Sequence, residues 1–242
     1  MGAVSELTAV TAAILAGGMG SRLRSVVADR PKVLADIHGK PFLTYLFDQL
    51  VAAGIKEIVL CTGYLGEQIN SLFGESYGAV RLTYSREPRP LGTAGALRLA
   101  LPLLRSDPVL VMNGDSYCEA NFQAFCVWHN RRRANATLLL TEVSETRRFG
   151  RVQVNDDGAV TDFEEKGDGR EPGWINAGIY LLTRRMLTEV PVGRPVSLER
   201  EIFPSWIGRG LYGFRNTERF VDIGTPESYA SAQFFFGTGV PQ

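Results

Sequence analysis

Short apolar segments alternate with amphipathic segments along the first half of the chain, and this alternation constrains the fold more than any other feature. Residues 10–16 and 56–64 are typical of buried strands, whereas residues 41–53 are typical of a helix with one apolar face. Strands that alternate with helices form a parallel sheet that is covered on both faces. The sequence therefore predicts an α/β fold. The other elements expected here are strands at 79–87 and 108–116 and helices at 67–73 and 93–104.

The pattern changes after residue 135, where strands follow one another with few helices between them. Residues 150–166 predict a hairpin that turns at Asp157–Gly158, because apolar and polar side chains alternate on both arms. No repeat or linker divides the chain, so we expect one domain over residues 1–242, with a small antiparallel extension of the sheet. The remaining expected elements are strands at 136–143 and 175–183 and a helix at 197–207 with Ser197 as its N-cap.

A glycine-rich segment, LAGGMGSRLRS, ends the first predicted strand. Such a turn exposes backbone N–H groups at the carboxyl edge of the sheet, where anions bind, and Arg22 and Lys32 add positive charge. The two best-known phosphate loops do not match, because G-x-x-x-x-G-K-[ST] is absent and Leu23 stands where the last glycine of G-x-G-x-x-G belongs. Taken alone, the segment is equally compatible with a phosphate site and with a tight turn that carries solvated arginines.

Two aspartates follow apolar residues in the sequence. Asp115 closes the apolar segment VLVMNGD, and Asp222 lies in RFVDIGTPESY. An aspartate at the carboxyl end of a buried strand can hold a magnesium ion that bridges phosphate oxygens. A helix-capping or loop aspartate is the alternative for Asp115, and sequence spacing alone cannot pair two carboxylates that lie so far apart.

Charge and cysteine content narrow the classes of partner. The chain has 26 basic and 26 acidic side chains, so its formal net charge is zero and gives no general attraction to nucleic acid or to a membrane surface. No apolar run approaches the length of a membrane span. We therefore expect a cytoplasmic protein with neither nucleic-acid nor membrane partners. Cys61, Cys118 and Cys126 show no metal-ligand spacing and are expected to be buried, reduced thiols.

The longer pattern around the glycine-rich segment resembles the sugar-nucleotide pyrophosphorylases. LAGGMGSRLRS, RPKVL and GKPFLTYLF stand in the order of that family's motifs, and the resemblance extends from Ala13 nearly to Tyr229. Ser25–Val26 stands where the family often has Pro and Thr, so RLRSVVADRPK is more similar to the branch that acts on heptose 1-phosphate, as is NGDSYC. The resemblance implies a Rossmann-like three-layer α/β/α nucleotidyltransferase domain with a mostly parallel central sheet. Its nucleotide-binding half would span about residues 1–135 and its sugar-binding half about residues 136–242.

The resemblance also implies a reaction, the transfer of a nucleotidyl group from an NTP to a sugar 1-phosphate with release of pyrophosphate. GTP is the expected donor, because Glu87 stands close to the expected base site and a carboxylate can accept from both N1–H and the 2-amino group of guanine. A surface glutamate is the alternative interpretation of Glu87. D-glycero-D-manno-heptose 1-phosphate is the expected acceptor; mannose 1-phosphate, or uridylyl or thymidylyl transfer to a hexose 1-phosphate, is the alternative. A non-catalytic regulatory subunit is the alternative of another class, and a homo-oligomer is compatible with each of these.

The resemblance implies four overlapping sets of residues, which bind metal, bind the nucleotide, bind the sugar 1-phosphate or act in catalysis. Mg²⁺ would bind Asp115 and Asp222. Read without the resemblance, Glu165 and Lys166 belong to a solvated charge run, and Asn176 is a buried asparagine bonded to backbone. The nucleotide would be bound by Leu15, Ala16, Gly17, Gly18, Gly20, Ser21, Arg22, Lys32, Glu87, Gly92, Thr93 and Asp115. The sugar 1-phosphate would be bound by Asn113, Gly114, Gly150, Glu165, Lys166 and Asn176, and the catalytic set would be Arg22, Lys32, Asp115, Lys166 and Asp222.

Overall fold

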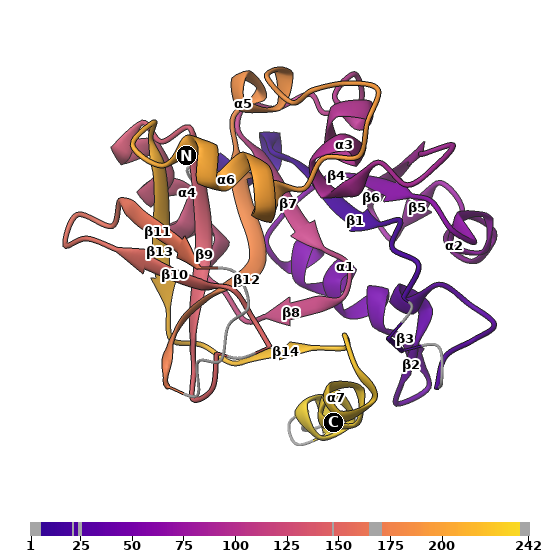
Figure 1. Ribbon diagram of the computed structural model, residues 1–242. Coiled ribbons are helices and arrows are strands. Elements are labelled where there is room, and N and C mark those ends of the chain that lie inside the picture. Colours follow the sequence, from indigo (N-terminus) through magenta and orange to yellow (C-terminus); the bar gives the residue numbers. More distant parts are fainter. Residues whose placement is uncertain (1–5, 21, 24–25, 147, 165–170, 238–242) are drawn as a thin grey trace, which may run out of the picture.

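The computed structural model describes residues 6–20, 22–23, 26–146, 148–164 and 171–237. The strands of its main sheet are β1 Thr11–Ala16, β4 Glu57–Thr62, β5 Ser76–Tyr77, β6 Val80–Arg86, β7 Val109–Asn113, β9 Ala136–Val143, β10 Arg151–Val154, β11 Val160–Glu164, β12 Gly173–Leu182 and β13 Leu211–Asn216. They lie in the order β11-β10-β12-β7-β1-β4-β6-β5, with β9 paired to β12 and β13 to β9 (Figure 1). Strands β7, β1, β4 and β6 are mutually parallel, which confirms the α/β fold expected from the sequence.

Helices cover both faces of this sheet, so the structure has three layers (Figure 1). Ala12 and Ile14 of β1 pack in one core and Ala13 in the other, because successive side chains of a strand point to opposite faces. The first core also contains residues of α1 Phe42–Ala52, α2 Gly66–Phe73, α4 Phe122–Arg132 and α7 Pro226–Gly237. The second contains residues of α3 Gly92–Ala100, α5 Arg184–Thr188, η3 Leu198–Ile202 and α6 Phe203–Trp206.

Two short antiparallel pairs lie beside the main sheet. They are β8 Ser116–Cys118 with β14 Phe220–Asp222, and β2 Asp36–Ile37 with β3 Lys40–Pro41, while η1 Glu6–Ala9 and η2 Lys32–Leu34 are single 3₁₀ turns. The prediction of one strand over 108–116 is wrong, since β7 ends at Asn113 and β8 begins at Ser116. The Gly114 N–H still donates to the Leu15 carbonyl oxygen at 2.9 Å, as in the β1–β7 ladder, and the chain then leaves the sheet so that residues 116–118 pair with β14 instead.

The predicted hairpin is confirmed as far as the structure describes it, with β10 and β11 antiparallel around a turn in which Gly158 has φ +81°. The helix predicted over 93–104 is too long, since α3 ends at Ala100. Pro102 has no N–H to donate, so the α-helical ladder stops, and the chain continues with the Leu103 N–H donating to Ala100 O. The helix predicted at 197–207 is a π-helical turn, η3, followed by α6, and the Ser197 hydroxyl accepts from the Arg200 N–H at 3.2 Å.

The three cysteines are buried and none of them forms a disulfide, as expected. Burial raises the pKa of Cys61 and of Cys118 to about 12, which keeps both thiols protonated at neutral pH. None of the helices in the described part of the chain combines the length and the apolar character that crossing a bilayer requires.

The buried side chain of His129 should make the free energy of unfolding depend on pH. His129 of α4 has its Nδ1 2.8 Å from Thr137 Oγ1, and burial lowers its pKa from 6.5 to about 4, although Asp107 opposes the shift. Because the folded state binds this proton less readily, the contribution of His129 is fully present above pH 6.5 and is lost as the pH falls toward 4. Between pH 7 and 4.5 the loss should be on the order of 2 kcal/mol.

Urea unfolding of the wild type and of His129→Gln at both pH values checks this expectation. The free energy of unfolding should fall further in the wild type than in the variant, because glutamine does not titrate. Equal decreases in the two proteins would show that His129 does not control the acid limb.

Candidate active site

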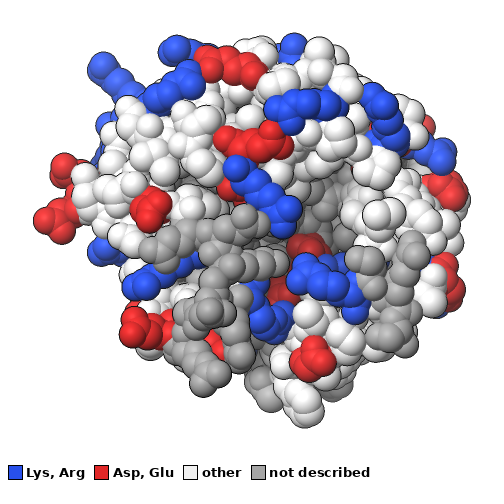
Figure 2. Space-filling view, viewed as in Figure 1, with Lys and Arg blue, Asp and Glu red and all other residues white. Residues whose placement is uncertain are grey.

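Two adjoining cavities lie at the carboxyl ends of the parallel strands. One has a volume of about 370 Å³ and is lined by residues that end β1, β4 and β7, and the other has about 450 Å³ and reaches β12 and η3. The two share Arg22, Thr93, Asn113, Asp115 and Gly224. Figure 2 shows a depression on this face with basic side chains around it and acidic side chains inside it. Ligands of open parallel sheets bind at this edge, so the cavities are the candidate site.

The structure brings most of the predicted nucleotide-binding residues to the first cavity. Ser21, which belongs to the same prediction, lies outside the described residues. The predicted residues that line this cavity are Leu15, Ala16, Gly17, Gly18, Gly20, Arg22, Lys32, Glu87, Gly92, Thr93 and Asp115, together with Asn113 from the predicted sugar set.

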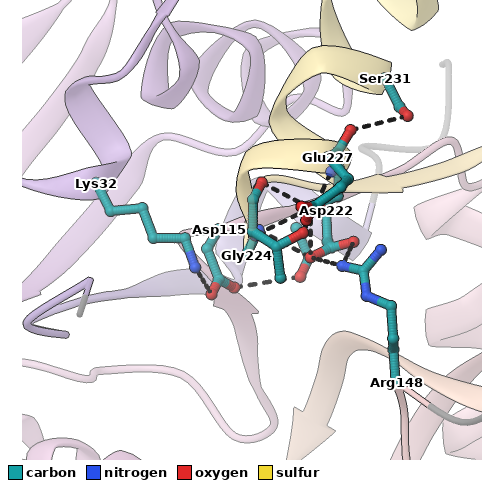
Figure 3. A network of polar contacts seen from close by, with 10 residues as sticks. Lys32, Asp115, Arg148, Asp222, Gly224, Glu227 and Ser231 are labelled. Carbon is teal, nitrogen blue, oxygen red and sulfur yellow. Dashed lines mark hydrogen bonds and ion pairs between the residues drawn. The ribbon is translucent and has the colours of Figure 1, made fainter. Parts of the chain in front are cut away.

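The pairing of β8 with β14 brings the two predicted metal-binding aspartates together, because Asp115 comes immediately before β8 and Asp222 ends β14. Asp222 is opposite Ser116 in the register, and the Ile223 N–H donates to the Asp115 carbonyl oxygen at 2.9 Å. The Ser116 hydroxyl donates to Asp115 Oδ1 at 3.2 Å. Figure 3 shows both carboxylates in one network of polar contacts. Residues far apart in the sequence thus form one acidic pair where the cavities meet.

A lysine neutralises the first of these carboxylates. Lys32 Nζ lies 2.6 Å from Asp115 Oδ2, and the two side chains are 12% and 40% exposed. Burial raises the pKa of Asp115, but Lys32, the Ser116 hydroxyl and Arg22 outweigh that effect and hold the pKa below its ordinary value. Asp115 is therefore a carboxylate at neutral pH.

An arginine that the sequence did not reveal neutralises the second. Arg148 Nη2 lies 3.1 Å from both carboxylate oxygens of Asp222 (Figure 3), whose side chain is only 14% exposed. Asp222 Oδ2 also accepts from the Gly224 N–H at 2.8 Å and from the Ser228 hydroxyl at 3.2 Å. The only sequence signal for Arg148 is its place two residues before Gly150, in RRFG.

The acidic pair fits a divalent cation. Carboxylate oxygens are the ligands that Mg²⁺ prefers, and it commonly takes one or two of them together with phosphate oxygens and water. Among the described residues no group of three or more His, Cys, Asp and Glu side chains gathers to hold an ion without such additional ligands. Lys32 and Arg148 form ion pairs with the two carboxylates, and Arg22 lines both cavities beside Asp115.

Glu87 lines the first cavity. Its backbone N–H donates to Thr62 O at 2.9 Å, and its Oε2 accepts from the Leu91 N–H at 2.9 Å, so the side chain is held in place rather than free in solvent. Partial burial raises the pKa of Glu87, while the Leu91 N–H opposes that shift. A half-buried carboxylate at a cavity wall is a potential hydrogen-bond acceptor for a ligand.

The start of α3 is held against the segment before η3. Gly92 has φ +73°, and a Cβ on it would lie 2.5 Å from the Val196 carbonyl oxygen, so only glycine fits there. The N–H groups of Ala94 and Gly95 donate to the same oxygen, which means that they are already satisfied within the protein. Thr93 points its hydroxyl at Glu199 Oε2, 2.8 Å away.

The second cavity contains part of the predicted sugar set. Gly150, Asn176 and Asn113 line it, whereas Gly114 lines neither cavity and lies against the Leu15 carbonyl oxygen. Glu165 and Lys166 lie outside the described residues, so their predicted roles stay predictions. Lining residues that sequence reasoning missed include Arg148, Phe163, Glu199, Arg200 and Phe220.

Comparison with known proteins identifies similar chains. Residues 11–238 match the family described as nucleotidyl transferase. The chain is 37% identical over 223 residues to D-glycero-alpha-D-manno-heptose 1-phosphate guanylyltransferase of Aneurinibacillus thermoaerophilus, an alignment that covers 92% of this chain and 96% of that protein. It is 36% identical over 224 residues to mannose-1-phosphate guanylyltransferase of Mycobacterium tuberculosis, which covers 91% of this chain but only 62% of that longer protein.

A solved structure agrees with these relatives. HddC from Yersinia pseudotuberculosis, crystallised in complex with GMP-PN, superposes with a TM-score of 0.82 at 32% sequence identity. The superposition covers 94% of this chain and 99% of HddC. The three-layer fold expected from the sequence is therefore confirmed by both the element order and the structural similarity.

Proposed function

The chain belongs to the nucleotidyl transferase family, and on that premise we propose that it transfers a guanylyl group from GTP to a sugar 1-phosphate, releasing pyrophosphate. D-glycero-D-manno-heptose 1-phosphate is the proposed acceptor, because the relative that this chain matches over nearly its full length is named for that substrate. The observation that carries the proposal is the acidic pair Asp115–Asp222 at the junction of two cavities. One cavity would hold GTP and the other the sugar.

In the proposed reaction a phosphate oxygen of the sugar 1-phosphate attacks the α-phosphorus of GTP in line, and pyrophosphate leaves from the opposite side. No covalent enzyme intermediate is needed, so rate enhancement comes from positioning and from neutralisation of charge. Arg22 and Lys32, on the glycine-rich side of the first cavity, would hold the triphosphate. Lys166 would contact the sugar phosphate.

The acidic pair would hold Mg²⁺, which when bound neutralises charge on the reacting phosphates. In this proposal Lys32 and Arg148 move from the carboxylates to phosphate oxygens as substrates enter, since both cations lie at the cavity walls. Glu87 would accept from the guanine edge, and Asn113, Gly150, Glu165 and Asn176 would contact the sugar.

A coupled assay of pyrophosphate release tests the function. The purified protein is given each of the four NTPs, and dTTP, in combination with heptose, mannose, glucose and N-acetylglucosamine 1-phosphates. GTP with the heptose 1-phosphate should give the highest kcat/KM. A clear preference for UTP or dTTP would overturn the guanine assignment to Glu87, and no release with any pair would overturn the enzymatic function in favour of a regulatory subunit.

Mannose 1-phosphate is the second candidate acceptor, favoured by the 36% identity to the mycobacterial mannose-1-phosphate guanylyltransferase. The same assay separates the two, because the acceptors differ while the donor is the same. The division into a nucleotide-binding half up to about residue 135 and a sugar-binding half after it, and self-association of the chain, stay predictions.

A further inference from the structure

A hydrogen-bonded chain of side chains connects residues that line the two cavities. Asn176 Nδ2 donates to the Tyr180 hydroxyl at 2.7 Å, and that hydroxyl donates to Glu199 Oε1 at 3.3 Å. Glu199 Oε2 accepts from the Thr93 hydroxyl at 2.8 Å and from the Ser197 hydroxyl at 2.9 Å. Glu199 therefore contacts Thr93, which lines both cavities, directly. It contacts Asn176, which lines the second cavity, through Tyr180.

An irregularity in β12 makes this chain feasible. In a regular strand, residues four apart are separated by about 13 Å, so their side chains could not bond to each other. Here the register moves from Asn176 opposite Leu140 to Tyr180 opposite Leu138, which means that four steps along β12 match two along β9. Gly178, with φ +79°, lies in the bulge, and its N–H donates to Asn176 Oδ1 at 2.8 Å. The bulge thus turns Asn176 back toward Tyr180.

Each member of this chain is restricted to one arrangement. Tyr180 is fully buried, and burial together with the nearby Glu199 raises its pKa well above the ordinary value, so it remains a neutral donor. With its hydrogen donated to Glu199, the Tyr180 oxygen accepts from Asn176, and the Asn113 side chain bonds to the same hydroxyl. Glu199, through Tyr180, and the Gly178 N–H, which donates to Asn176 Oδ1, therefore fix together which way the Asn176 amide faces in the second cavity.

The same carboxylate also orients the nucleotide side. Thr93 donates to Glu199, and its hydroxyl oxygen accepts from the Leu198 N–H at 2.8 Å, so both functions of that hydroxyl are used. Thr93 lines both cavities at the start of α3. A change in the charge of Glu199 would therefore disturb both Thr93 and Tyr180, whereas a change in Tyr180 would leave the bond between Thr93 and Glu199 in place.

We propose that Glu199 is a positioning residue that sets Thr93 for the nucleotide and, through Tyr180, Asn176 for the sugar 1-phosphate. The inference rests on the proposed function, since it assigns the two cavities to those two substrates. Glu199 acts on substrates through Thr93 and Tyr180, so its effect should appear in both substrate affinities at once. Burial of a polar chain alone, as a purely structural feature, would instead change stability without a matched change in the two KM values.

Three variants test the proposal. Glu199→Gln keeps the side-chain shape but removes the negative charge that strengthens the bonds from Thr93, Ser197 and Tyr180, and one amide oxygen cannot replace two carboxylate oxygens, so the KM for GTP and the KM for the sugar 1-phosphate should each rise about tenfold. Tyr180→Phe keeps the bond between Thr93 and Glu199, so it should raise the KM for the sugar 1-phosphate by about fivefold and the KM for GTP by less. In the double variant, the sugar KM should rise by less than the product of the single effects, because both act on one chain of bonds.

Glu201→Gln is the matched control. Glu201 lies two residues along the same element, is exposed, and pairs with Arg194 at 2.7 Å without lining either cavity. Its loss of charge should change neither KM. Melting temperatures of all variants show whether each KM is measured on folded protein. If Glu199→Gln does not fold, Tyr180→Phe is the milder change and still tests the link to the sugar 1-phosphate.

The outcomes separate this inference from the proposed function. If the wild type releases pyrophosphate and Glu199→Gln behaves like Glu201→Gln, the positioning role is wrong while the function stands. If the wild type is inactive with every sugar 1-phosphate, the proposed function is wrong. In that case calorimetric binding of GTP still decides the positioning role, because Glu199→Gln must weaken binding more than Tyr180→Phe does.

Discussion

Asp222→Asn should lower the kcat/KM for pyrophosphate release by about a thousandfold, because it removes one of two carboxylates at the junction of the cavities. Asparagine has nearly the same shape as aspartate, so its amide oxygen can still accept from the Gly224 N–H, as Asp222 Oδ2 does in the wild type. The negative charge is what disappears. Arg148 loses its ion pair, and a divalent cation loses an anionic ligand. Steady-state kinetics over a Mg²⁺ titration measure both effects.

Glu227→Gln provides the comparison for this variant. Glu227 lies close to Asp222 in Figure 3 and stands in the first turn of α7, the helix that follows β14, but it is exposed and lines neither cavity. The same charge is removed a few residues away, so a general electrostatic effect would lower activity in both proteins. We expect Glu227→Gln to keep wild-type kinetics. Wild-type activity in folded Asp222→Asn would contradict the assignment of the acidic pair.

The parallel core of the sheet could be predicted because its signals are local. Short apolar runs predict β1, β4 and β6, and an amphipathic run predicts α1. In each case the apolar residues of the run are themselves the ones that are buried. The split of residues 108–116 into β7 and β8 could not be predicted in this way. Strand β8 exists through its pairing with β14, which lies more than a hundred residues later, and no local pattern records that partner.

The candidate site shows the same division. The glycine-rich loop and its cations were visible as a motif, whereas the ion pair between Lys32 and Asp115 depends on how η2 packs beside the end of β7. Arg148 was one of several arginines in a polar segment, and only the fold shows that it faces Asp222. A charged side chain becomes part of a specific site when the tertiary structure brings an opposite charge next to it. The distance between the two charges cannot be derived from their positions in the sequence.

Tyr180 and Glu199 were hidden for a different reason. Tyr180 reads as one more apolar residue of a buried strand, since a regular strand gives no hint of the bulge at Gly178. Glu199 reads as a polar residue on an exposed helix face, but η3 turns it toward Thr93. Departures from regular secondary structure are set by packing, and they are common near functional sites.

Lys32→Met should lower kcat/KM by about a hundredfold and also change its pH dependence. Methionine fills a similar volume, but it leaves no positive charge 2.6 Å from Asp115 Oδ2 and none for the triphosphate. Lys32 is the largest influence that lowers the pKa of Asp115, and burial, which raises it, remains. The pKa of Asp115 should therefore rise in the variant, so the acid limb of the kcat/KM profile moves to higher pH.

Lys40→Met separates the local charge from the net charge. Lys40 is exposed in β3, and its loss changes the net charge of the protein by the same amount. Its profile from pH 4.5 to 8 should coincide with that of the wild type.

A hundredfold loss in Lys32→Met without movement of the acid limb would mean that Lys32 contacts the nucleotide but does not hold Asp115 ionised. Movement of the limb with full activity at high pH would mean the reverse, that its role is to keep Asp115 charged. The expected result contains both changes, because one ammonium group faces the carboxylate and lines the nucleotide cavity.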